Sequence, residues 1–366
     1  MNRPLRKILA AAIGFALSPL ANAADDPPKT FSAEDVQEAC DRAGKYLLSQ
    51  QWGSGCIQGG GDRGKRKHDE RRPPRHSVTM SSLAVMGLAA IGHTPSDPTD
   101  EGKAMRAALD FVLRPQHQDD EGYFGRIDNS RMYGHGIITL MLAEMLGMGA
   151  DEEMDRTIRD RCQKAINLIV RSQKAREGRG SNKGGWRYEP DSSDSDLSVT
   201  VWQLMALRAA KNGGLEVPKK VIDDAIGYVR RTFNKREGAF GYTAGGGHIL
   251  FSTAAEGLLS MQVCGEYDAD EVIKAADYLL KRDPQKESQW FYYGLYYYAQ
   301  GMAQRGGEHA STAKQSTSRT LLKLQDKDGS WRPRGGNEHE GGKIYATSMA
   351  LLSLSIHHNF LPIYQR

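Results

Sequence analysis

Two kinds of helical pattern alternate along the chain. In the segments Asp35–Gln51 and Asp155–Gln173, charged residues alternate with an apolar stripe that recurs at helical spacing. This pattern predicts amphipathic helices that bury one face. Other segments, such as Ile344–Ile356, are apolar on nearly all faces, which predicts helices that are buried on every side. No period-two alternation of any length occurs, so the sequence predicts an all-α fold.

Both kinds of helix belong to one internal repeat. A unit begins with a basic residue and Ala, continues with an aromatic or aliphatic pair and Gln, and ends in a Gly-rich turn followed by an aromatic residue. The Gln place is taken by Gln51, Gln116, Gln173, Phe233, Gln289 and Gln325. A second, apolar helix follows each turn. In five of the six units this helix carries Thr near its start: Thr79, Thr139, Thr200, Thr253 and Thr347.

Six units of two helices predict twelve helices in two layers. An outer amphipathic ring around an inner buried ring closes as an α6/α6 toroid. An open helical solenoid is the alternative, but solenoids need polar capping units at their ends. Ile344–Ile356 is as apolar as the middle helices, which favours the closed ring. Because no linker-like composition interrupts the repeat, we expect one domain over residues 33–366, after a flexible lead over residues 24–32.

Residues 1–23 have the pattern of a secretory signal. The segment Met1–Lys7 is basic, Ile8–Leu20 is mostly apolar, and Ala21-Asn22-Ala23 supplies the small-x-small cleavage pattern. A transmembrane anchor is the alternative, but the apolar run is short and is broken by Ser18-Pro19. We therefore expect export, with a periplasmic or secreted protein after cleavage near Ala23.

The charge and the cysteine spacing limit the possible binding partners and metal sites. The 49 Lys and Arg against 45 Asp and Glu give a formal net charge of +4, and loss of the leader's three basic residues lowers it to +1. A near-neutral chain gives no support for a nucleic-acid partner. The spacing of Cys40, Cys56, Cys162 and Cys264 fits no zinc motif. In an exported protein Cys40 and Cys56 can form a disulfide, and buried free thiols are the alternative. We expect no metal and no cofactor.

The repeat resembles that of the prenyltransferase and squalene-oxidase repeat family, the α/α toroids of terpene cyclases and protein prenyltransferases. The Gln…Gly-x-Trp pattern carries the resemblance, which covers nearly all of the chain after the leader. Segments 133–139, 184–190 and 194–203 are similar to an exported, single-domain bacterial branch of the family. The resemblance implies the toroid fold, a fold that serves many chemistries.

In a toroid the inner helix ends open onto a central cavity, so the residues just before each inner helix are site candidates. Asp194-Ser195-Asp196-Leu197 resembles the Asp-x-Asp-Asp motif of class II terpene cyclases, whose middle Asp protonates an alkene. The resemblance implies Asp196 as the general acid and Asp194 as its flank, with Leu197 in place of the third Asp. Such an acid needs an apolar setting that keeps it protonated. Alternatively, Ser192, Asp194 or Asp196 caps the helix that begins at Leu197.

The remaining candidates are histidines and aromatic residues near the same helix starts. Aromatic faces stabilise cations and stack on sugars, although helical spacing also sends such rings into the core. Histidines can bind a metal or act as a base, but no His-x3-His pair supports a metal here. The ligand-binding candidates are His76, His135, Trp186, His248, Tyr292, Tyr293, Tyr296 and Tyr345. The basic residues 63–75 predict a solvated loop or peripheral contact with anionic lipid headgroups.

Three functions remain, and the residues leave enzyme and non-enzyme open. The first is binding of a hydrophobic isoprenoid-like ligand, with or without its cyclisation or isomerisation. The second is a non-catalytic envelope interaction module, whose protein partner the sequence does not name. The third is a carbohydrate-active toroid, which needs two carboxylates across the cavity. An apolar, aromatic cavity with a buried Asp196 favours the first, a shallow polar bowl the second, and a second acid facing Asp196 the third.

Overall fold

The computed structural model describes residues 31–57, 75–176, 178–335, 338–358 and 360–365. The predicted leader over residues 1–23, residues 24–30 of the predicted lead, and residues 63–74 of the basic stretch lie outside the described residues. All elements described below belong to one unit, Phe31–Arg366.

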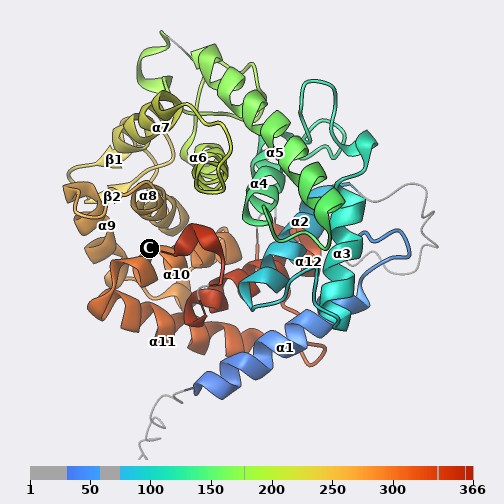
Figure 1. Cartoon of the computed structure of the whole chain (residues 1–366). Helices are drawn as coiled ribbons and strands as arrows, with labels where there is room; N and C mark the ends of the chain where they lie inside the picture. The colour runs from blue at the N-terminus through green and yellow to red at the C-terminus, as the bar shows by residue number, and fades with distance from the viewer. Residues whose placement is uncertain (1–30, 58–74, 177, 336–337, 359, 366) are drawn as a thin grey trace, which may run out of the picture. The chain divides into compact units, whose positions relative to one another are not determined.

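Six apolar helices form an inner ring in which each helix contacts the next and the last contacts the first (Figure 1). These are α2 (Ser77–Ala90), α4 (Arg131–Glu144), α6 (Leu197–Asn212), α8 (Phe251–Val263), α10 (Phe291–Arg305) and α12 (Glu338–Leu354). Six helices surround them: α1 (Ala33–Ser49), α3 (Asp100–Val112), α5 (Glu152–Gln173), α7 (Lys219–Arg231), α9 (Asp270–Leu280) and α11 (Gly307–Leu324). The predicted α6/α6 toroid is confirmed.

Short elements complete the turns. The strands β1 (Phe233–Asn234) and β2 (Ala239–Phe240) pair antiparallel, with Phe233 opposite Phe240. The 3-10 turns are η1 (Pro115–His117), η2 (Lys174–Arg176), η3 (Gly180–Asn182), η4 (Pro284–Lys286), η5 (Ser355–His357) and η6 (Pro362–Tyr364). The hairpin lies in the fourth unit, where Phe233 replaces the repeat Gln.

The two helix patterns correspond to two degrees of burial. Every residue of α2 and of α8 is buried, because these helices are covered on all sides. The outer helices α1 and α5 instead bury one stripe and expose their charged residues. The predicted last helix, Ile344–Ile356, corresponds to the part of α12 that follows a kink at Gly342, whose φ is 61°, and one further turn from Glu338 precedes the kink.

In four of the six units a Gln ties the unit to the next, whereas the predicted Gln289 lines the central cavity. In unit three, Gln173 Nε2 donates to the carbonyl oxygen of Gly184 in its own turn at 3.0 Å and to that of Val221 on the next outer helix at 2.9 Å. Equivalent pairs are made by Gln51 and Gln118. In the second unit the clamp is therefore Gln118 and not the predicted Gln116, because η1 adds a 3-10 turn before it.

The same contact closes the ring between the last unit and the first. Gln325 Nε2 donates to the carbonyl oxygens of Gly329 and Ala39, at 3.0 and 2.8 Å. Gly329 lies so close to α1 that a Cβ there would be 2.3 Å from the carbonyl oxygen of Arg42. An open solenoid has no such contact between its ends, which excludes that alternative.

The repeat Thr and Trp are structural. The backbone N–H of Trp186 donates to Thr200 Oγ1 at 3.0 Å, and that of Trp331 donates to Thr347 Oγ1 at 3.1 Å. Both indoles are fully buried, and Trp186 Nε1 also donates to the Ile169 carbonyl oxygen at 3.0 Å. These bonds hold the turns of the third and sixth units against their inner helices.

The four cysteines are free. Burial raises the pKa of the Cys40 thiol to about 12 and that of Cys56 to about 11. The structure thus matches the buried-thiol alternative and contains no Cys40–Cys56 disulfide.

The segment near the C-terminus packs against the inner ring. Ile363, three residues before the end of the chain, donates its backbone N–H to Glu144 Oε2 of α4 at 3.2 Å.

Candidate functional site

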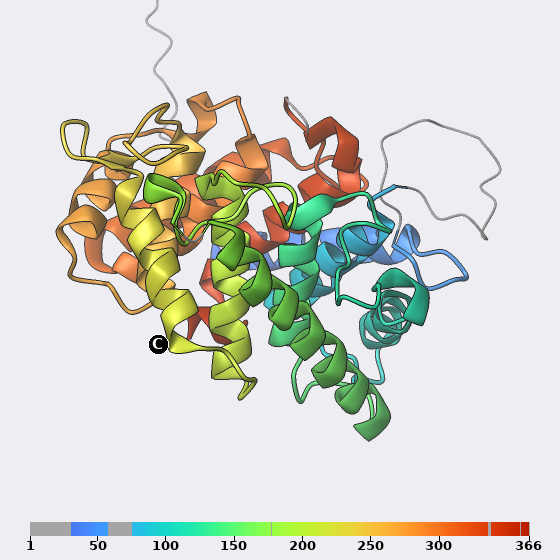
Figure 2. The same cartoon turned by 90° about the horizontal axis from the view of Figure 1, so that it is seen from above.

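A cavity of about 690 Å³ lies at the N-terminal ends of the inner helices. All six inner helices contribute residues to its wall. Figure 2 shows the loops that enter α6 and α8 at one end of the bundle and the C-terminus toward the other. Seven aromatic residues line the cavity: Tyr133, Tyr188, Trp202, Tyr242, Trp290, Tyr293 and Tyr345. Convergent helix ends with aromatic walls form a typical ligand site of a helical bundle.

Backbone strain is concentrated at this cavity. Among the described residues, five non-glycine residues have a positive φ, between 53° and 63°, and all five line the cavity. They are His76, Asn129, Arg131, His248 and Trp290. Such conformations cost of order 1–3 kcal/mol each and persist where the surrounding structure enforces them, often at functional sites. The strain therefore makes the mouth of the cavity the candidate functional region.

Asp128 and Glu338 are two of the buried carboxylates that cap inner helices, and they differ in how many of their oxygens accept hydrogen bonds. Asp128 uses both oxygens: Oδ1 accepts from Val78 N at 2.9 Å, and Oδ2 accepts from Thr79 N at 3.1 Å and from the Thr79 hydroxyl. Glu338 uses one oxygen, since Oε1 accepts from Tyr292 N at 2.8 Å. Its Oε2 is buried and has no hydrogen-bond partner among the described residues. Asp128 is thus a complete cap, whereas Glu338 keeps a free acceptor.

That free oxygen belongs to a residue of the cavity wall. Glu338 is 2% exposed and lines the cavity. Burial raises the pKa of its carboxyl to about 7, and the backbone N–H groups of Tyr293, Tyr292 and Arg334 and the Arg334 charge oppose this shift. A carboxyl that titrates near neutral pH can donate and accept a proton. Glu340, exposed and two residues further on, also lines the cavity, so one turn presents two carboxyls.

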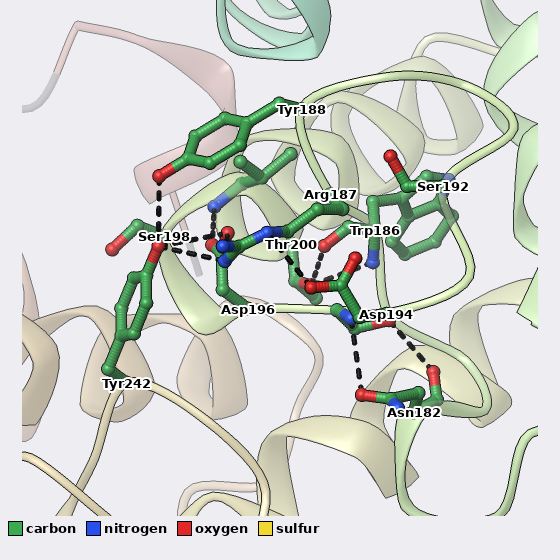
Figure 3. Close-up of polar contacts among 12 residues, drawn as sticks. Asn182, Trp186, Arg187, Tyr188, Ser192, Asp194, Asp196, Ser198, Thr200 and Tyr242 are labelled. Carbon is green, nitrogen blue, oxygen red and sulfur yellow. Dashed lines mark hydrogen bonds and ion pairs between the residues drawn. The ribbon is translucent and has the colours of Figure 1, made fainter.

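Asp196, the acid implied by the family resemblance, is fully buried and caps α6 (Figure 3). Its Oδ1 accepts from Val199 N at 2.7 Å, and its Oδ2 accepts from Arg187 Nη1 at 2.6 Å. The Tyr242 hydroxyl donates to Oδ2 at 3.2 Å. Burial raises the pKa of the Asp196 carboxyl, while the Val199 N–H and the Arg187 guanidinium oppose that shift. With both oxygens occupied by donors, Asp196 has the geometry of a cap and an ion-pair partner.

Asp196 reaches the cavity only through other side chains. The Tyr242 hydroxyl accepts from Arg187 Nη1 at 2.9 Å and lies 3.0 Å from the Tyr188 hydroxyl. Tyr188 and Tyr242 line the cavity, whereas Asp196 does not. Asp194 is exposed and pairs with Arg187 Nε at 3.3 Å. The pair Asp194 and Asp196 therefore supports the wall from behind.

The structure brings four of the other candidates to the cavity: His76, His248, Tyr293 and Tyr345. His135, Trp186, Tyr292 and Tyr296 lie elsewhere, in packed surroundings. His135 Nε2 lies 3.2 Å from the Ala165 carbonyl oxygen, and burial lowers its pKa to about 4. The Tyr292 hydroxyl donates to the Arg332 carbonyl oxygen at 2.9 Å, and the Tyr296 ring stacks on Trp202 at 6.0 Å.

Sequence reasoning missed Glu338 and a second buried acid, Glu256. Glu256 lies on α8, one turn beyond the cavity residues Ser252 and Thr253, and is fully buried. Neither of its oxygens has a hydrogen-bond partner among the described residues, and burial raises its pKa to about 8, opposed by the Ser198 hydroxyl. A single charge in the otherwise apolar run 251–263 was the available signal.

Within the part of the chain that the structure describes, no group of three or more His, Cys, Asp or Glu residues is placed to hold a metal ion. No described helix combines the length and apolar character needed to cross a membrane.

Comparison with known proteins identifies the class of fold. No protein-family model and no curated protein sequence matches the chain. Among solved structures, an inactive variant of the α-1,6-mannanase GH76A of Salegentibacter sp. HEL1_6, in complex with α-1,6-mannotriose, superposes with a TM-score of 0.61 and 7% identity. That match covers 88% of this chain and 98% of the mannanase.

Two further solved structures have the same fold. The type II terpene cyclase MstE from Scytonema superposes with a TM-score of 0.54 and 15% identity, over 90% of this chain and all of that one. A possible GH105 family member from Salmonella enterica serovar Paratyphi A gives 0.54 and 11%, over 93% and 97%. At these identities the likeness shows a shared α/α toroid fold, which terpene cyclases and glycosidases have in common.

Proposed function

We propose that this protein is a carbohydrate-active toroid whose cavity binds a glycan chain and whose Glu338 protonates the oxygen of a glycosidic bond. The observation that carries the proposal is the buried, unpartnered Oε2 of Glu338 in an aromatic cavity wall. As the proton reaches the oxygen, the bond from that oxygen to the anomeric carbon breaks. Water then adds to the carbon and gives its proton to a second carboxylate. We assign this role to Glu340, which also lines the cavity but lies on the same turn of α12 as Glu338 and not across the cavity.

The aromatic wall and the buried Asp196 match the pattern expected for an isoprenoid site, but Asp196 lies behind the wall and does not line the cavity. The unpaired polar atoms around the cavity instead favour a hydroxyl-rich ligand over a hydrocarbon. Trp202 lines the cavity, is 1% exposed, and has an Nε1–H without an acceptor among the described residues. Glu338 Oε2 and Ser130 Oγ also lack partners among the described residues, so the wall has at least one unpaired donor, one unpaired acceptor and one unpaired hydroxyl. A buried polar atom left unpaired costs about 1–3 kcal/mol. Sugar hydroxyls can satisfy these atoms while sugar rings stack on the aromatic side chains, whereas an isoprenoid chain cannot.

The first test is hydrolysis of a polysaccharide panel that includes α-1,6-mannan, followed by reducing-end assay and mass spectrometry of the products. The informative variant is Glu338→Gln. Its amide oxygen still accepts from Tyr292 N, but the amide cannot supply a proton. We expect a loss of about 10²–10⁴-fold in rate with an unchanged melting temperature.

The matched control is Asp128→Asn at the other carboxylate cap. Because Asp128 uses both oxygens in capping, this variant should lower stability by about 1–3 kcal/mol and leave the activity per folded molecule unchanged. If Glu338→Gln keeps full activity on a polysaccharide that the wild type cleaves, Glu338 is not the proton donor.

The proton donor also predicts the pH profile. Glu338 must be protonated to act, and its pKa is raised to about 7. Activity should therefore fall as pH rises through about 7. The same alkaline limb in residual Glu338→Gln activity would contradict this assignment.

A second candidate function is binding of a hydrophobic isoprenoid-like ligand. The observation that favours it is a neutral acid beneath aromatic rings: burial raises the pKa of Glu256 to about 8, and this residue interacts with Tyr133 and Tyr293. Incubation with a lipid extract containing squalene and polyprenyl species tests it. A cyclised or isomerised product that Asp196→Asn abolishes would establish a cyclase, and an unchanged retained isoprenoid a carrier. With neither glycan nor isoprenoid bound, the envelope interaction module remains.

We further propose that the chain is exported, on the pattern of residues 1–23 alone. Mass spectrometry of the protein from cell fractions tests this, with a mature N-terminus after Ala23 as the expected result. Contact of the basic residues 63–75 with anionic lipid is likewise a proposal. Co-sedimentation with anionic and neutral vesicles tests it, and equal binding to both would refute it.

A further inference from the structure

A second hollow of about 420 Å³ adjoins the central cavity. We call it the side groove, and its lining includes Tyr123, Arg126, Asn129, Arg131, Glu189 and Asp191. Asn129 and Arg131 line both the side groove and the cavity, so the two hollows meet at these residues. Both have positive φ values of 56°. The strained backbone therefore lies at the junction.

One wall of the side groove is the loop that leads into α4, and its backbone is closed on itself. Arg131 N donates to the Gly125 carbonyl oxygen at 3.0 Å. A Cβ on Gly125 would lie 2.0 Å from the Arg131 carbonyl oxygen, so only glycine fits. Arg126 Nη1 pairs with Asp119 at 2.9 Å. These contacts hold the wall in one conformation.

The opposite wall is the loop around Pro190, and a buried arginine holds it. The Arg176 side chain is fully buried and donates to the carbonyl oxygens of Glu189 at 3.1 Å, Pro190 at 2.9 Å and Asp194 at 3.2 Å. Burial lowers the pKa of Arg176 to about 10, which still leaves it charged at neutral pH. Glu189 Oε1 bridges the walls to Arg131 Nε at 3.3 Å. Both walls are therefore fixed before any ligand arrives.

One buried polar atom of the side groove has no partner. Tyr123 is 2% exposed and lines the groove, and its hydroxyl forms no hydrogen bond with any described residue. Carboxylates from Glu189 and Asp191 and guanidinium groups from Arg126 and Arg131 surround the same hollow. Closely spaced donors and acceptors of both signs match the vicinal hydroxyls of a sugar better than a single ion.

We infer that the side groove is a second carbohydrate subsite, which holds the part of a glycan chain that extends past Arg131 out of the cavity. The inference rests on the proposed function. It makes the substrate an oligosaccharide or polysaccharide longer than the cavity alone holds, cleaved at an internal bond.

The test measures affinity against chain length by isothermal titration calorimetry. The protein is the full chain carrying Glu338→Gln, and the probes are oligosaccharides of the polysaccharide that the wild type cleaves, in the first instance mannobiose to mannohexaose of the α-1,6 series. We expect the Kd of the hexaose to lie at least about tenfold below that of the biose, equivalent to about 1.4 kcal/mol.

The groove variant is Tyr123→Phe, which removes only the unpartnered hydroxyl. It should raise the Kd of the longest oligosaccharide by about fivefold, the value of one hydrogen bond, and leave the shortest unchanged. The matched control is Tyr228→Phe. Tyr228 is a fully buried tyrosine whose hydroxyl also lacks a partner, but it lines neither hollow. This control should bind all chain lengths as the parent does.

The outcomes separate this inference from the proposed function. Affinity that does not depend on chain length, or equal effects of Tyr123→Phe and Tyr228→Phe, overturns the side groove and leaves the cavity in place. If no polysaccharide is bound or cleaved at all, the proposed function fails and the subsite fails with it.

Discussion

Replacement of Asp196 by Ala should destabilise the protein far more than replacement of its neighbour Asp194. Both carboxylates reach Arg187, but their surroundings differ. Asp196 is fully buried and lies 2.6 Å from Arg187 Nη1, whereas the Asp194 side chain is 60% exposed at 3.3 Å from Nε. The comparison therefore measures what the buried carboxylate contributes to the fold.

The magnitude follows from the bonds that are lost. Removal of the cap that accepts from Val199 N costs about 1 kcal/mol. Removal of one partner from a buried ion pair costs about 3–5 kcal/mol. The lower end of this range applies, because the Arg187 side chain is 24% exposed and would still form its ion pair with Asp194. We expect Asp196→Ala to cost about 4 kcal/mol in total, and Asp194→Ala less than about 0.5 kcal/mol.

The assay is urea unfolding followed by far-UV circular dichroism, with both variants compared at the same m-value. A third protein, Asp196→Ala with Arg187→Met, separates the two terms. With the guanidinium gone, no charge is left unpaired, so the double variant should recover about 2 kcal/mol of the loss. If the free energies of unfolding of Asp196→Ala and Asp194→Ala differ by less than about 0.5 kcal/mol, Asp196 is not a structural cap, and a role of Asp196 as the general acid of a cyclase becomes the better hypothesis.

Three further predictions test the buried acid, the glycine contacts and the ring closure. Burial raises the pKa of Glu256 from 4.5 to about 8. Between these pH values the folded protein binds a proton that the unfolded chain does not, so the melting temperature should fall as pH rises from about 4.5 to about 8. In Glu256→Gln this fall should be smaller. Gly184→Ala should lower the free energy of unfolding by roughly 3 kcal/mol or more, because its Cβ would lie 2.0 Å from the Asp224 carbonyl oxygen. Gly214 has a similar positive φ but open space around it, so Gly214→Ala should cost only about 1–2 kcal/mol. Urea unfolding measures both. Gln325→Leu should cost about 2 kcal/mol by the same assay, because two carbonyl oxygens of the closing contact lose their donor; a neutral result would mean that the first and last units are not clamped.

The fold could be predicted because the same local sequence pattern recurs in six units. The Gln position, the glycine turn and the apolar second helix each appear in sequence before any tertiary contact is known. The errors arose where a unit departs from the average. The 3-10 turn Pro115–His117 moved the clamp from Gln116 to Gln118, and the bend at Gly342 put the start of α12 outside the apolar pattern.

The candidate site was harder to predict from the sequence, because it depends on hydrogen bonds between residues that are far apart in the chain. Glu338 is recognised by its bond to the N–H of Tyr292, 46 residues earlier in the chain. Its neighbours in sequence carry no motif, and its helical turn precedes the apolar run. The histidines show the converse. Both His76 and His135 were predicted just before inner helices, but His76 is the N-cap of α2 and lines the cavity, whereas His135 lies within α4 and packs against the Ala165 carbonyl oxygen.

The three carboxylates at the mouth show what separates a structural acid from a chemical one. Asp128, Asp196 and Glu338 cap α2, α6 and α10, which are alternate helices of the inner ring, and all three are nearly or fully buried. Their burial and their role as caps therefore do not distinguish them. The oxygens do: in Asp128 and Asp196 both are occupied by donors, and in Glu338 one is not. A cap that leaves a buried oxygen unused gains nothing in stability from it, and this unused oxygen is the observation on which the proposed contact with a ligand rests.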